Sequence, residues 1–441
     1  MALTGRAALL ALLGAPVVFL LPFFWTVVAW AAVLAVLAIA DALLAAPVSS
    51  LRLVRSGATA CRLGEQVEVT LAVTNPGPRR LRGVLRDAWV PSAGASPRTH
   101  QLDVPAGERR VLTTFLRPTR RGDRLPDRVT VRAVGPLGIA ARQGRHELPW
   151  RVRVQPPFTS RTFLPERLAR LRQLDGAVAL RMRGQGTEFD SLRDYVQGDD
   201  VRSIDWRATA RRQEVVVRTW RPERDRTLLL VIDTSRTSAG RVGDVPRLDA
   251  ALDAALLLCA LASRAGDRVD LLAIDREPRA AVEGVRRDEL LPRMVDVMAG
   301  LEPALVESDG RRLVAEVLRR TRRRSLIVLF TSLDTAPLEE GLLPVLGSLT
   351  ARHTVLLAAV ADPRVEQMAG AGANGPGAGG SDADAVEAAY DVASAERART
   401  ERRRLTALLR RRGVEVVDAP PERFAPAVSD AYLALKAAGR L

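Results

Sequence analysis

The chain has 441 residues, which is enough for two or three domains. It carries 66 Lys and Arg against 51 Asp and Glu, a net charge of +15, and Lys436 is the only lysine. A P-loop needs a Gly-Lys-Ser/Thr element, which Lys436 does not provide, so a P-loop nucleotide triphosphatase is excluded. The three histidines, His100, His146 and His353, are far apart in the sequence, which argues against a zinc protease or a histidine-based triad.

The cysteines and the distribution of charge limit the compartment and the partners. Cys61 and Cys259 cannot make a disulfide framework, so we expect a reducing compartment. An excess of positive charge is compatible with nucleic acid, anionic lipid or acidic partners. Because the arginines are interleaved with acidic residues along the chain, nucleic acid is not expected to be the partner.

The first part of the chain is apolar. No charged residue occurs over Ala7–Ala40, whereas one membrane helix needs only roughly 20 residues. Pro22 near the middle favours two helices, at about Ala7–Leu21 and Trp25–Leu44, joined by a tight turn. A cleaved signal peptide is the alternative, but its apolar core of about 7–15 residues is shorter than this run. We therefore expect a transmembrane hairpin within residues 1–48.

Arginines flank this apolar segment on both sides: Arg6 precedes it, and Arg52, Arg55 and Arg62 follow it. Cationic residues next to membrane helices concentrate on the cytoplasmic side. The expected location is therefore the cell membrane, with a multi-pass N-terminus and soluble domains in the cytoplasm. This location agrees with the expectation of reduced cysteines.

Short alternating segments separated by Pro and Gly turns occupy residues 51–155. The clearest is Gly64–Gly77, which alternates apolar and polar residues and ends in Asn-Pro-Gly. This spacing is typical of an antiparallel β-sandwich, which would act as an interaction module or as a spacer. The other candidate strands are Leu81–Val90, Arg109–Leu116, Arg128–Val134 and Trp150–Val154.

A charged segment follows at residues 156–225. Residues 181–226 hold 11 arginines and 9 acidic residues. This alternation favours a structural network of Arg–carboxylate pairs, because neighbouring arginines keep carboxylates ionised. The catalytic alternative would require an acid–base pair among Glu188, Asp194 and Asp205. Two aromatic residues of this segment, Trp206 and Trp220, are expected to anchor packing.

Continuous apolar runs alternate with helical patterns over residues 226–441. Apolar runs of this kind suit strands that are buried on both faces. The alternation predicts a doubly wound α/β fold with a parallel sheet, with Cys259 in its core. The predicted strands are Thr227–Ile232, Val269–Ile274, Leu326–Phe330, Val355–Val360 and Val414–Val417, and the predicted helices are Leu248–Arg264, Glu289–Leu301, Arg311–Arg322, Leu338–Ala351 and Ala385–Arg412.

One glycine-rich stretch interrupts this domain. Residues 370–380 read GAGANGPGAGG and contain a single Gly-x-Gly-x-x-Gly. The motif neither directly follows a predicted strand nor opens a helix, as a dinucleotide site requires. We interpret residues 368–384 as a flexible insertion.

Oxygen-bearing side chains follow two of the predicted strands. Ligands of parallel sheets bind beyond the carboxyl ends of the strands, and Asp233 lies at such an end. Asp233, Ser235 and Thr237 form Asp-x-Ser-x-Thr, and oxygens from one loop suit Mg²⁺. The alternative is simple termination of a buried strand. The predicted metal ligands are Asp233, Ser235, Thr237, Ser308 from a second loop and Asp334 from the strand ending at Phe330.

These residues resemble a known pattern. Residues 226–441 resemble a von Willebrand factor A-type domain, whose metal-ion-dependent adhesion site has Asp-x-Ser-x-Ser, a threonine from a second loop and an aspartate from a third. Asp233 and Ser235 match this pattern, while Thr237 and Ser308 depart from it but keep a hydroxyl group. The preceding blocks GTEFDSLRDY, GDDVRSIDW and ARR closely resemble the signature of the bacterial "domain of unknown function 58" family.

The resemblance implies a membrane-anchored bacterial protein, often encoded beside a MoxR-type AAA+ ATPase. We expect a non-enzymatic adaptor whose A-type domain binds such an ATPase during assembly or maturation of envelope or other complexes. In such sites a partner carboxylate completes the Mg²⁺ shell. One alternative is a metal-assisted hydrolase that uses Asp233, Asp334 and Asp199 or Asp200. The other is a basic scaffold that binds anionic lipid or nucleic acid through the arginine-rich helix ending at Arg412.

Overall fold

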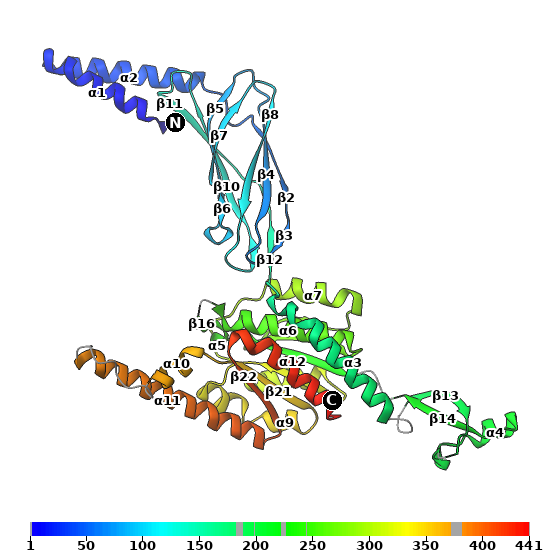
Figure 1. Cartoon of the computed structure of the whole chain (residues 1–441). Coiled ribbons are helices and arrows are strands. Elements are labelled where there is room, and N and C mark those ends of the chain that lie inside the picture. The colour runs from blue at the N-terminus through cyan, green and yellow to red at the C-terminus, as the bar shows by residue number, and fades with distance from the viewer. Residues whose placement is uncertain are drawn as a thin grey trace. The chain divides into compact units, whose positions relative to one another are not determined.

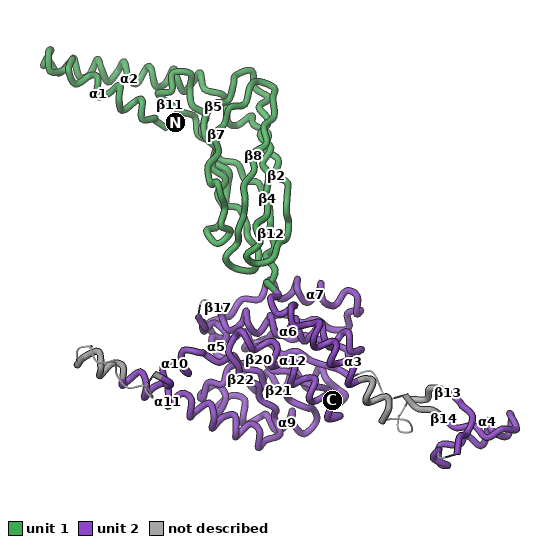
Figure 2. The backbone as a smooth tube through the Cα atoms, viewed as in Figure 1, with its two compact units in different colours: residues 1–157 green, residues 158–441 purple. Residues whose placement is uncertain are grey.

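We describe the protein from a computed structural model. The chain divides into two compact units, Met1–Pro157 and Phe158–Leu441 (Figure 2). Each unit has its own buried apolar clusters, so the expectation of a multidomain protein is confirmed. The described residues are 2–181, 188–197, 199–221, 226–243, 245–371 and 382–440.

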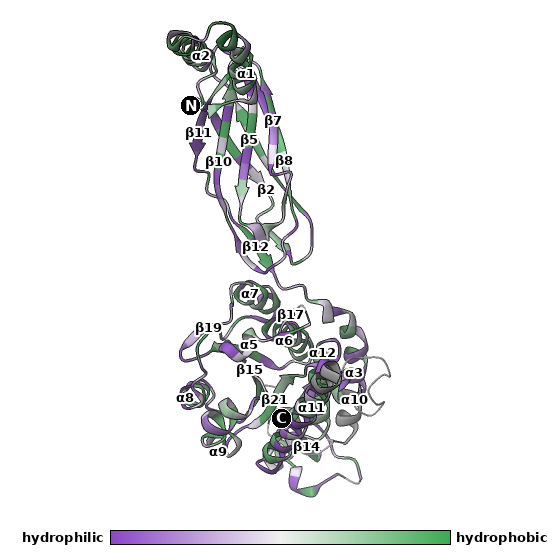
Figure 3. Cartoon of the chain, turned by 90° about the vertical axis from the view of Figure 1, so that its left-hand side faces the viewer, coloured by the Kyte–Doolittle hydropathy of each residue, from purple (hydrophilic) through white to green (hydrophobic). Residues whose placement is uncertain are grey.

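Two apolar helices begin the first unit: α1 at Gly5–Leu20 and α2 at Phe24–Leu44 (Figures 1 and 3). Trp30 of α2 lies directly over Gly14 of α1, where a methyl group would overlap the indole ring, so the helices are in close contact. Among the described helices, α2 is the one that is long and apolar enough to cross a membrane, and α1 is shorter. By length and composition α2 is a candidate for a membrane anchor or a signal sequence.

Both ends of this helix pair join one turn of the β structure, between β10 (Pro126–Val134) and β11 (Ala140–His146). Just before α1, the backbone N–H of Thr4 donates to the carbonyl oxygen of Ile139 at 3.0 Å. Near the end of α2, the carboxylate of Asp41 is fully buried against the same turn. It accepts hydrogen bonds from the backbone N–H groups of Leu137, Ile139 and Ala140 at 2.7, 2.7 and 2.8 Å.

Two larger antiparallel sheets form most of the first unit. One has the strand order β1-β11-β10-β5-β7 and the other β2-β4-β8-β6, and a small sheet has the order β3-β12-β9. Buried residues from both larger sheets, such as Val73 and Val131, share one core, so these sheets pack face to face. The remaining strands are β1 Ala2–Leu3, β2 Arg52–Gly57, β3 Ala60–Arg62, β4 Val67–Thr74, β5 Leu81–Trp89, β6 Ala95–Ser96, β7 Thr99–Val104, β8 Arg109–Leu116, β9 Gly122–Arg124 and β12 Val152–Gln155.

The second unit is built on a sheet with the strand order β19-β18-β15-β20-β21-β22 in the described part of the chain. The pairs β15–β18, β15–β20, β20–β21 and β21–β22 are parallel, and β19 is antiparallel at one edge. The sequence analysis missed β19 because this largely exposed strand has no continuous apolar run. The strands are β15 Thr227–Asp233, β18 Arg268–Ile274, β19 Pro278–Val282, β20 Ser325–Phe330, β21 Thr354–Val360 and β22 Val414–Ala419.

Alternate residues of these strands contribute to two apolar cores, one on each face of the sheet. Leu228 and Leu230 pack with α6, α7 and α12, whereas Leu229 and Val231 pack with α8 and α9. Cys259 of α6 is fully buried in the first of these cores, as predicted. The helices are α3 Leu164–Arg181, α5 Arg236–Ala239, α6 Arg247–Arg264, α7 Arg287–Ala299, α8 Gly310–Arg320, α9 Leu346–Thr350, α10 Pro363–Ala371, α11 Asp382–Arg411 and α12 Pro421–Ala437.

One predicted helix of the second unit differs from expectation, and the predicted insertion lies partly outside the described residues. The single helix predicted over Leu338–Ala351 is a π-helical turn, Pro337–Leu342, followed by α9. Of the predicted insertion at 368–384, residues 372–381 lie outside the described residues, and its two ends belong to α10 and α11.

The charged segment contains β13 (Glu188–Asp194) and β14 (Val216–Arg221), which pair antiparallel, and α4 (Trp206–Arg212).

Candidate functional site at the carboxyl edge of the sheet

The strand order reverses beside β15. The chain passes from β15 to β18 on one side and later to β20 on the other side. In open α/β sheets, ligands bind outside the carboxyl ends of the strands at such a reversal. Asp233 is the last residue of β15, and the pairing of Ile232 with Phe330 places Thr331 beside it on the neighbouring strand. Asp233 and Thr331 therefore mark the candidate site.

The carboxylate of Asp233 is almost completely buried, with 2% of the residue exposed. Its Oδ1 accepts the backbone N–H of Ser235 at 2.8 Å, in a local Asx-type turn that follows from the Asp-x-Ser sequence. Its Oδ2 accepts the hydroxyl of Thr331 at 2.7 Å and, more weakly, that of Thr237 at 3.5 Å. Burial raises the pKa of Asp233, and these hydrogen bonds oppose the rise.

The structure brings three of the five predicted metal ligands together. The hydroxyl oxygens of Ser235 and Thr237 are 3.0 Å apart, and both residues contact Asp233. Asp334 instead forms an ion pair with Arg247, at 3.4 Å between Oδ2 and Nη1. Asp334 lies four residues beyond the end of β20 and three residues before the π-helical segment. Its carbonyl oxygen accepts the N–H of Leu338, which lies near the start of that segment.

Ser308, the remaining predicted ligand, lies in the loop at residues 301–309, between α7 and α8. This loop is held to the Asp233 turn by backbone hydrogen bonds. The N–H of Arg236 donates to the carbonyl of Val306 at 2.8 Å, and the N–H of Ala304 donates to the carbonyl of Thr234 at 2.7 Å. The loop therefore borders the candidate site, and its attachment to the turn is through main-chain atoms of these residues.

Sequence reasoning missed Thr331. The acidic residue that follows the strand, Asp334, was the expected ligand. The register of the two strands instead places Thr331, the first residue after Phe330, beside Asp233. In a parallel pair, residues at equal distances from the paired strand ends lie side by side. Counting from the ends of Thr227–Ile232 and Leu326–Phe330 would have found the threonine that contacts Asp233.

A second carboxylate supports the turn from the adjacent strand. Asp275 follows β18, and its Oδ2 accepts the hydroxyl of Thr234 at 3.1 Å and the Nε–H of Arg279 at 2.6 Å. Burial alone would raise the pKa of Asp275, but the hydrogen bonds from Arg279 and from backbone N–H groups hold that pKa below its usual value. Through its bond with Thr234, the ionised carboxylate of Asp275 helps to fix the backbone next to Asp233.

The donor set at this edge fits a Mg²⁺ ion. Mg²⁺ keeps several waters and is commonly held by one or two carboxylates. Asp233 provides one carboxylate, and Ser235, Thr237 and Thr331 provide hydroxyl oxygens. The described residues contain no cluster of three or more His, Cys, Asp or Glu side chains suited to a metal.

The charged segment contains capping interactions and Arg–carboxylate ion pairs, as the structural interpretation of its sequence predicted. Asp205 caps α4 and pairs with Arg218 at 2.8 Å, and Asp199 pairs with Arg193 at 2.5 Å. The hydrogen bonds from these arginines are the main reason that the pKa values of both carboxylates are lowered. The side chain of Glu188 is outside the described residues.

The expectation that Trp206 anchors packing is wrong. Trp206 is 65% exposed, because it is the first residue of a short helix whose buried contacts are few. Val196 and Val201 of the same segment are about equally exposed, at 61% and 60%. The side chain of Trp220 lies outside the described residues.

Residues 191–376 match the family model described as "Protein of unknown function DUF58", which supports the resemblance to that family over this region. Over 186 residues the chain is 31% identical to uncharacterized proteins of Mycobacterium tuberculosis and Mycobacterium bovis. The match covers 41% of this chain and 57% of each relative, so the chain spans little more than half the length of these relatives.

The likenesses to solved structures are distant. A CARDB domain from Pyrococcus furiosus, in complex with two metal ions, is 17% identical and has a TM-score of 0.17, covering 24% of this chain and 87% of that domain. A β-glucosidase from Listeria innocua is 17% identical with a TM-score of 0.16, covering 22% of this chain and 16% of the enzyme. Likenesses at these scores carry no argument about this protein.

Proposed function

We propose that this protein is a membrane-anchored, non-enzymatic adaptor whose C-terminal domain binds a protein partner at the Asp233 edge. The observation that carries the proposal is the loop at residues 301–309, which is bonded to the Asp233 turn and carries Leu305 with 84% of its surface exposed. An exposed leucine alone is ordinary on a protein surface. Because its neighbours Ala304 and Val306 are bonded to the Asp233 turn, Leu305 offers an apolar contact for a docked protein beside the reversal of the sheet.

The proposed fold of this domain is von Willebrand factor A-like. Support comes from the parallel pairing of β15 with both neighbours and from the helices on both faces of the sheet. The Asp-x-Ser-x-Thr turn at Asp233 is the counterpart of the adhesion-site turn in that fold, and Thr331 adds a hydroxyl from the neighbouring strand. In this proposal a partner carboxylate completes the shell of a Mg²⁺ ion held at Asp233.

The proposed anchor is a hairpin of α1 and α2 that crosses the bacterial cell membrane twice. Support comes from the attachment of both helices to one turn, through Thr4 and Asp41, because a hairpin must begin and end on the same side. The 16 residues of α1 are short for a crossing, which snorkelling flanks or local thinning of the bilayer would accommodate. Arg6, Arg52 and Arg55 next to the helices favour a cytoplasmic location for the soluble parts.

Binding is favoured over hydrolysis because the acids named for a hydrolase have other partners. Asp334 pairs with Arg247, and Asp199 pairs with Arg193. The carboxylate of Asp233 accepts hydrogen bonds from the hydroxyls of Thr331 and Thr237, at 2.7 and 3.5 Å. The proposed partner is a MoxR-type AAA+ ATPase acting in assembly or maturation of envelope or other complexes, a suggestion that comes from the family resemblance.

Affinity capture from bacterial membranes tests this function. The tagged full-length chain is solubilised in detergent with Mg²⁺ or with EDTA, and bound proteins are quantified by mass spectrometry. Leu305→Asp tests the docking loop, and Leu125→Asp, at a leucine of the first unit that is 50% exposed, is the matched control. We expect a MoxR-type ATPase with wild type and Leu125→Asp in Mg²⁺ and a loss of about tenfold or more with Leu305→Asp. Equal recovery by both variants, or no AAA+ ATPase in any sample, would contradict the proposal.

A further inference from the structure

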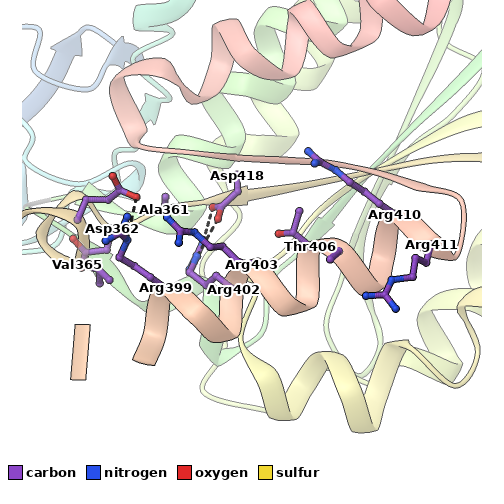
Figure 4. A pocket seen from close by; sticks show the side chains of 12 residues that line it. Ala361, Asp362, Val365, Arg399, Arg402, Arg403, Thr406, Arg410, Arg411 and Asp418 are labelled. Carbon is purple, nitrogen blue, oxygen red and sulfur yellow. Dashed lines mark hydrogen bonds and ion pairs between the residues drawn. The ribbon is translucent and has the colours of Figure 1, made fainter. Parts of the chain in front are cut away.

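A groove lies beyond the carboxyl ends of β21 and β22, between α10 and α11 (Figure 4). Its volume is about 620 Å³, and small or apolar residues, including Ala361, Val365 and Ala407, form part of its lining. Cavities of this size are typical of sites for small ligands or for short peptide segments. The groove is open along the arginine-rich face of α11.

The groove carries more positive than negative charge. Five arginines and three carboxylates line it, which leaves an excess of two positive charges. Arg402 pairs with Asp418 at 2.5 Å, and Arg399 pairs with Glu396 at 2.8 Å. Arg403, Arg410 and Arg411 are exposed, and none of them has an ion-pair partner among the described residues.

One further group in the groove is the Nε–H of Arg399. It is buried, and its ion-pair partner Glu366, a carboxylate of the groove itself, has its Oε1 4.0 Å away, too far for a hydrogen bond. A buried donor of a charged group costs free energy when it is left without an acceptor. Because Glu366 already faces this donor, the groups that an acidic ligand would meet are the free guanidinium groups of Arg403 and Arg410.

The free guanidinium groups are distributed along the helix. Arg403 and Arg410 are seven residues apart, which is about 10 Å along an α-helix, and Figure 4 shows Thr406 between them. A single phosphate is bound best when arginines converge on one point. Charges spaced along a groove instead suit several carboxylates of one extended chain. Side chains on one face of such a chain are about 7 Å apart, and the long arginine side chains can adjust to the difference from about 10 Å.

We propose that this groove binds an acidic peptide segment of a protein partner. Glutamate or aspartate side chains of the segment pair with Arg403, Arg410 and Arg411, and its backbone lies over the small residues of the floor. Arg402 with Asp418 shows the same pairing within the chain. The proposal does not rest on docking at the Asp233 edge, because none of the residues at that edge lines the groove.

Fluorescence anisotropy of a labelled Glu-rich peptide with the full-length chain, in nanodiscs of neutral lipid, tests this site. The variant Arg403→Gln/Arg410→Gln removes two groove charges. Arg397→Gln/Arg404→Gln is the control, because it removes two exposed charges from the same helix, also seven residues apart, that do not line the groove. A Gln-rich peptide of equal length, inorganic phosphate and vesicles with or without anionic lipid are the comparison ligands.

We expect the groove variant to weaken binding of the Glu-rich peptide about five- to tenfold, and the control variant to leave it within about twofold. Binding should also fall steeply with salt, and phosphate at concentrations similar to those of the peptide should not displace it. Equal weakening by both variants would mean that net charge alone attracts the peptide and would overturn the proposal. Binding to anionic vesicles that the groove variant abolishes, without binding to the peptide, would also overturn it and assign the groove to a membrane surface.

Discussion

Thr331 donates a 2.7 Å hydrogen bond to the buried carboxylate of Asp233, from the end of β20 to the end of the parallel strand β15. This bond links the ends of the two strands beside which the strand order of the sheet reverses. It stabilises the ionised form of a carboxylate that is almost completely buried. The chemistry that the edge can support therefore depends on these two residues together.

Removal of the Thr331 hydroxyl should destabilise the second unit. We expect Thr331→Val to lower the free energy of unfolding by about 1–3 kcal/mol at neutral pH, because the buried carboxylate of Asp233 loses a donor. Thr237→Val should cost less, since its hydroxyl is 3.5 Å from the same carboxylate. Denaturant unfolding of the full-length chain in detergent measures both variants. An equal loss of unfolding free energy in the two variants would show that the 2.7 Å bond from Thr331 stabilises the protein no more than the 3.5 Å contact of Thr237.

The stability of the protein without metal should depend on pH through Asp233. Burial raises the pKa of Asp233 above its ordinary value of 3.8, so near that value and above it the folded state holds the proton more tightly than the unfolded state. The stabilisation from the protonated acid is complete below the unfolded pKa and is lost as pH rises through the folded pKa. In EDTA, unfolding free energies of Asp233→Asn should lack this fall. Parallel pH profiles for wild type and variant would contradict the assignment.

Mg²⁺ binding should follow the ligand set that the structure assembles. Calorimetric titration of the full-length chain should give heat that Asp233→Ala abolishes. Asp334→Ala should retain binding, because the carboxylate of Asp334 is engaged in an ion pair with Arg247. Loss of binding in Asp334→Ala, with the fold intact by circular dichroism, would favour the ligand set expected from the sequence.

Asp41 should fix the helix pair to the first unit. Its carboxylate accepts three backbone hydrogen bonds from the β10–β11 turn. Asp41→Ala should therefore cost about 3 kcal/mol or more, because buried N–H groups lose a charged acceptor. It should also increase cleavage by trypsin at Arg142, just after the turn. Asp127→Ala, at a carboxylate that is 59% exposed, is the control, and equal cleavage of the two variants would refute the role of Asp41.

Much of the fold follows from patterns in the sequence. The apolar runs at Thr227–Ile232 and Leu326–Phe330 became β15 and β20, because strands covered on both faces need apolar residues throughout. The turn at Pro22 between two apolar helices was also predicted. In contrast, β19 was missed because it lies at an edge and buries only one end of its sequence.

The site was predicted in part, for a reason that lies in strand register. Asp233, Ser235 and Thr237 are close in sequence, so local turn chemistry indicates that they meet. Thr331 meets them through the alignment of two strands about 100 residues apart, which motif spacing does not reveal but a comparison of the two strand ends does. Asp334, four residues beyond β20, pairs with Arg247, a contact that its position near a strand end did not predict.

The central claim is that a protein partner docks on the loop at residues 301–309 beside Asp233. The most direct measurement is photo-crosslinking in living cells, with a photoreactive amino acid in place of Leu305 and, separately, in place of Leu125. The account predicts an ultraviolet-dependent adduct to a MoxR-type AAA+ ATPase from position 305 and not from position 125, weakened by Asp233→Asn. Adducts from both positions alike, or from neither, would contradict it.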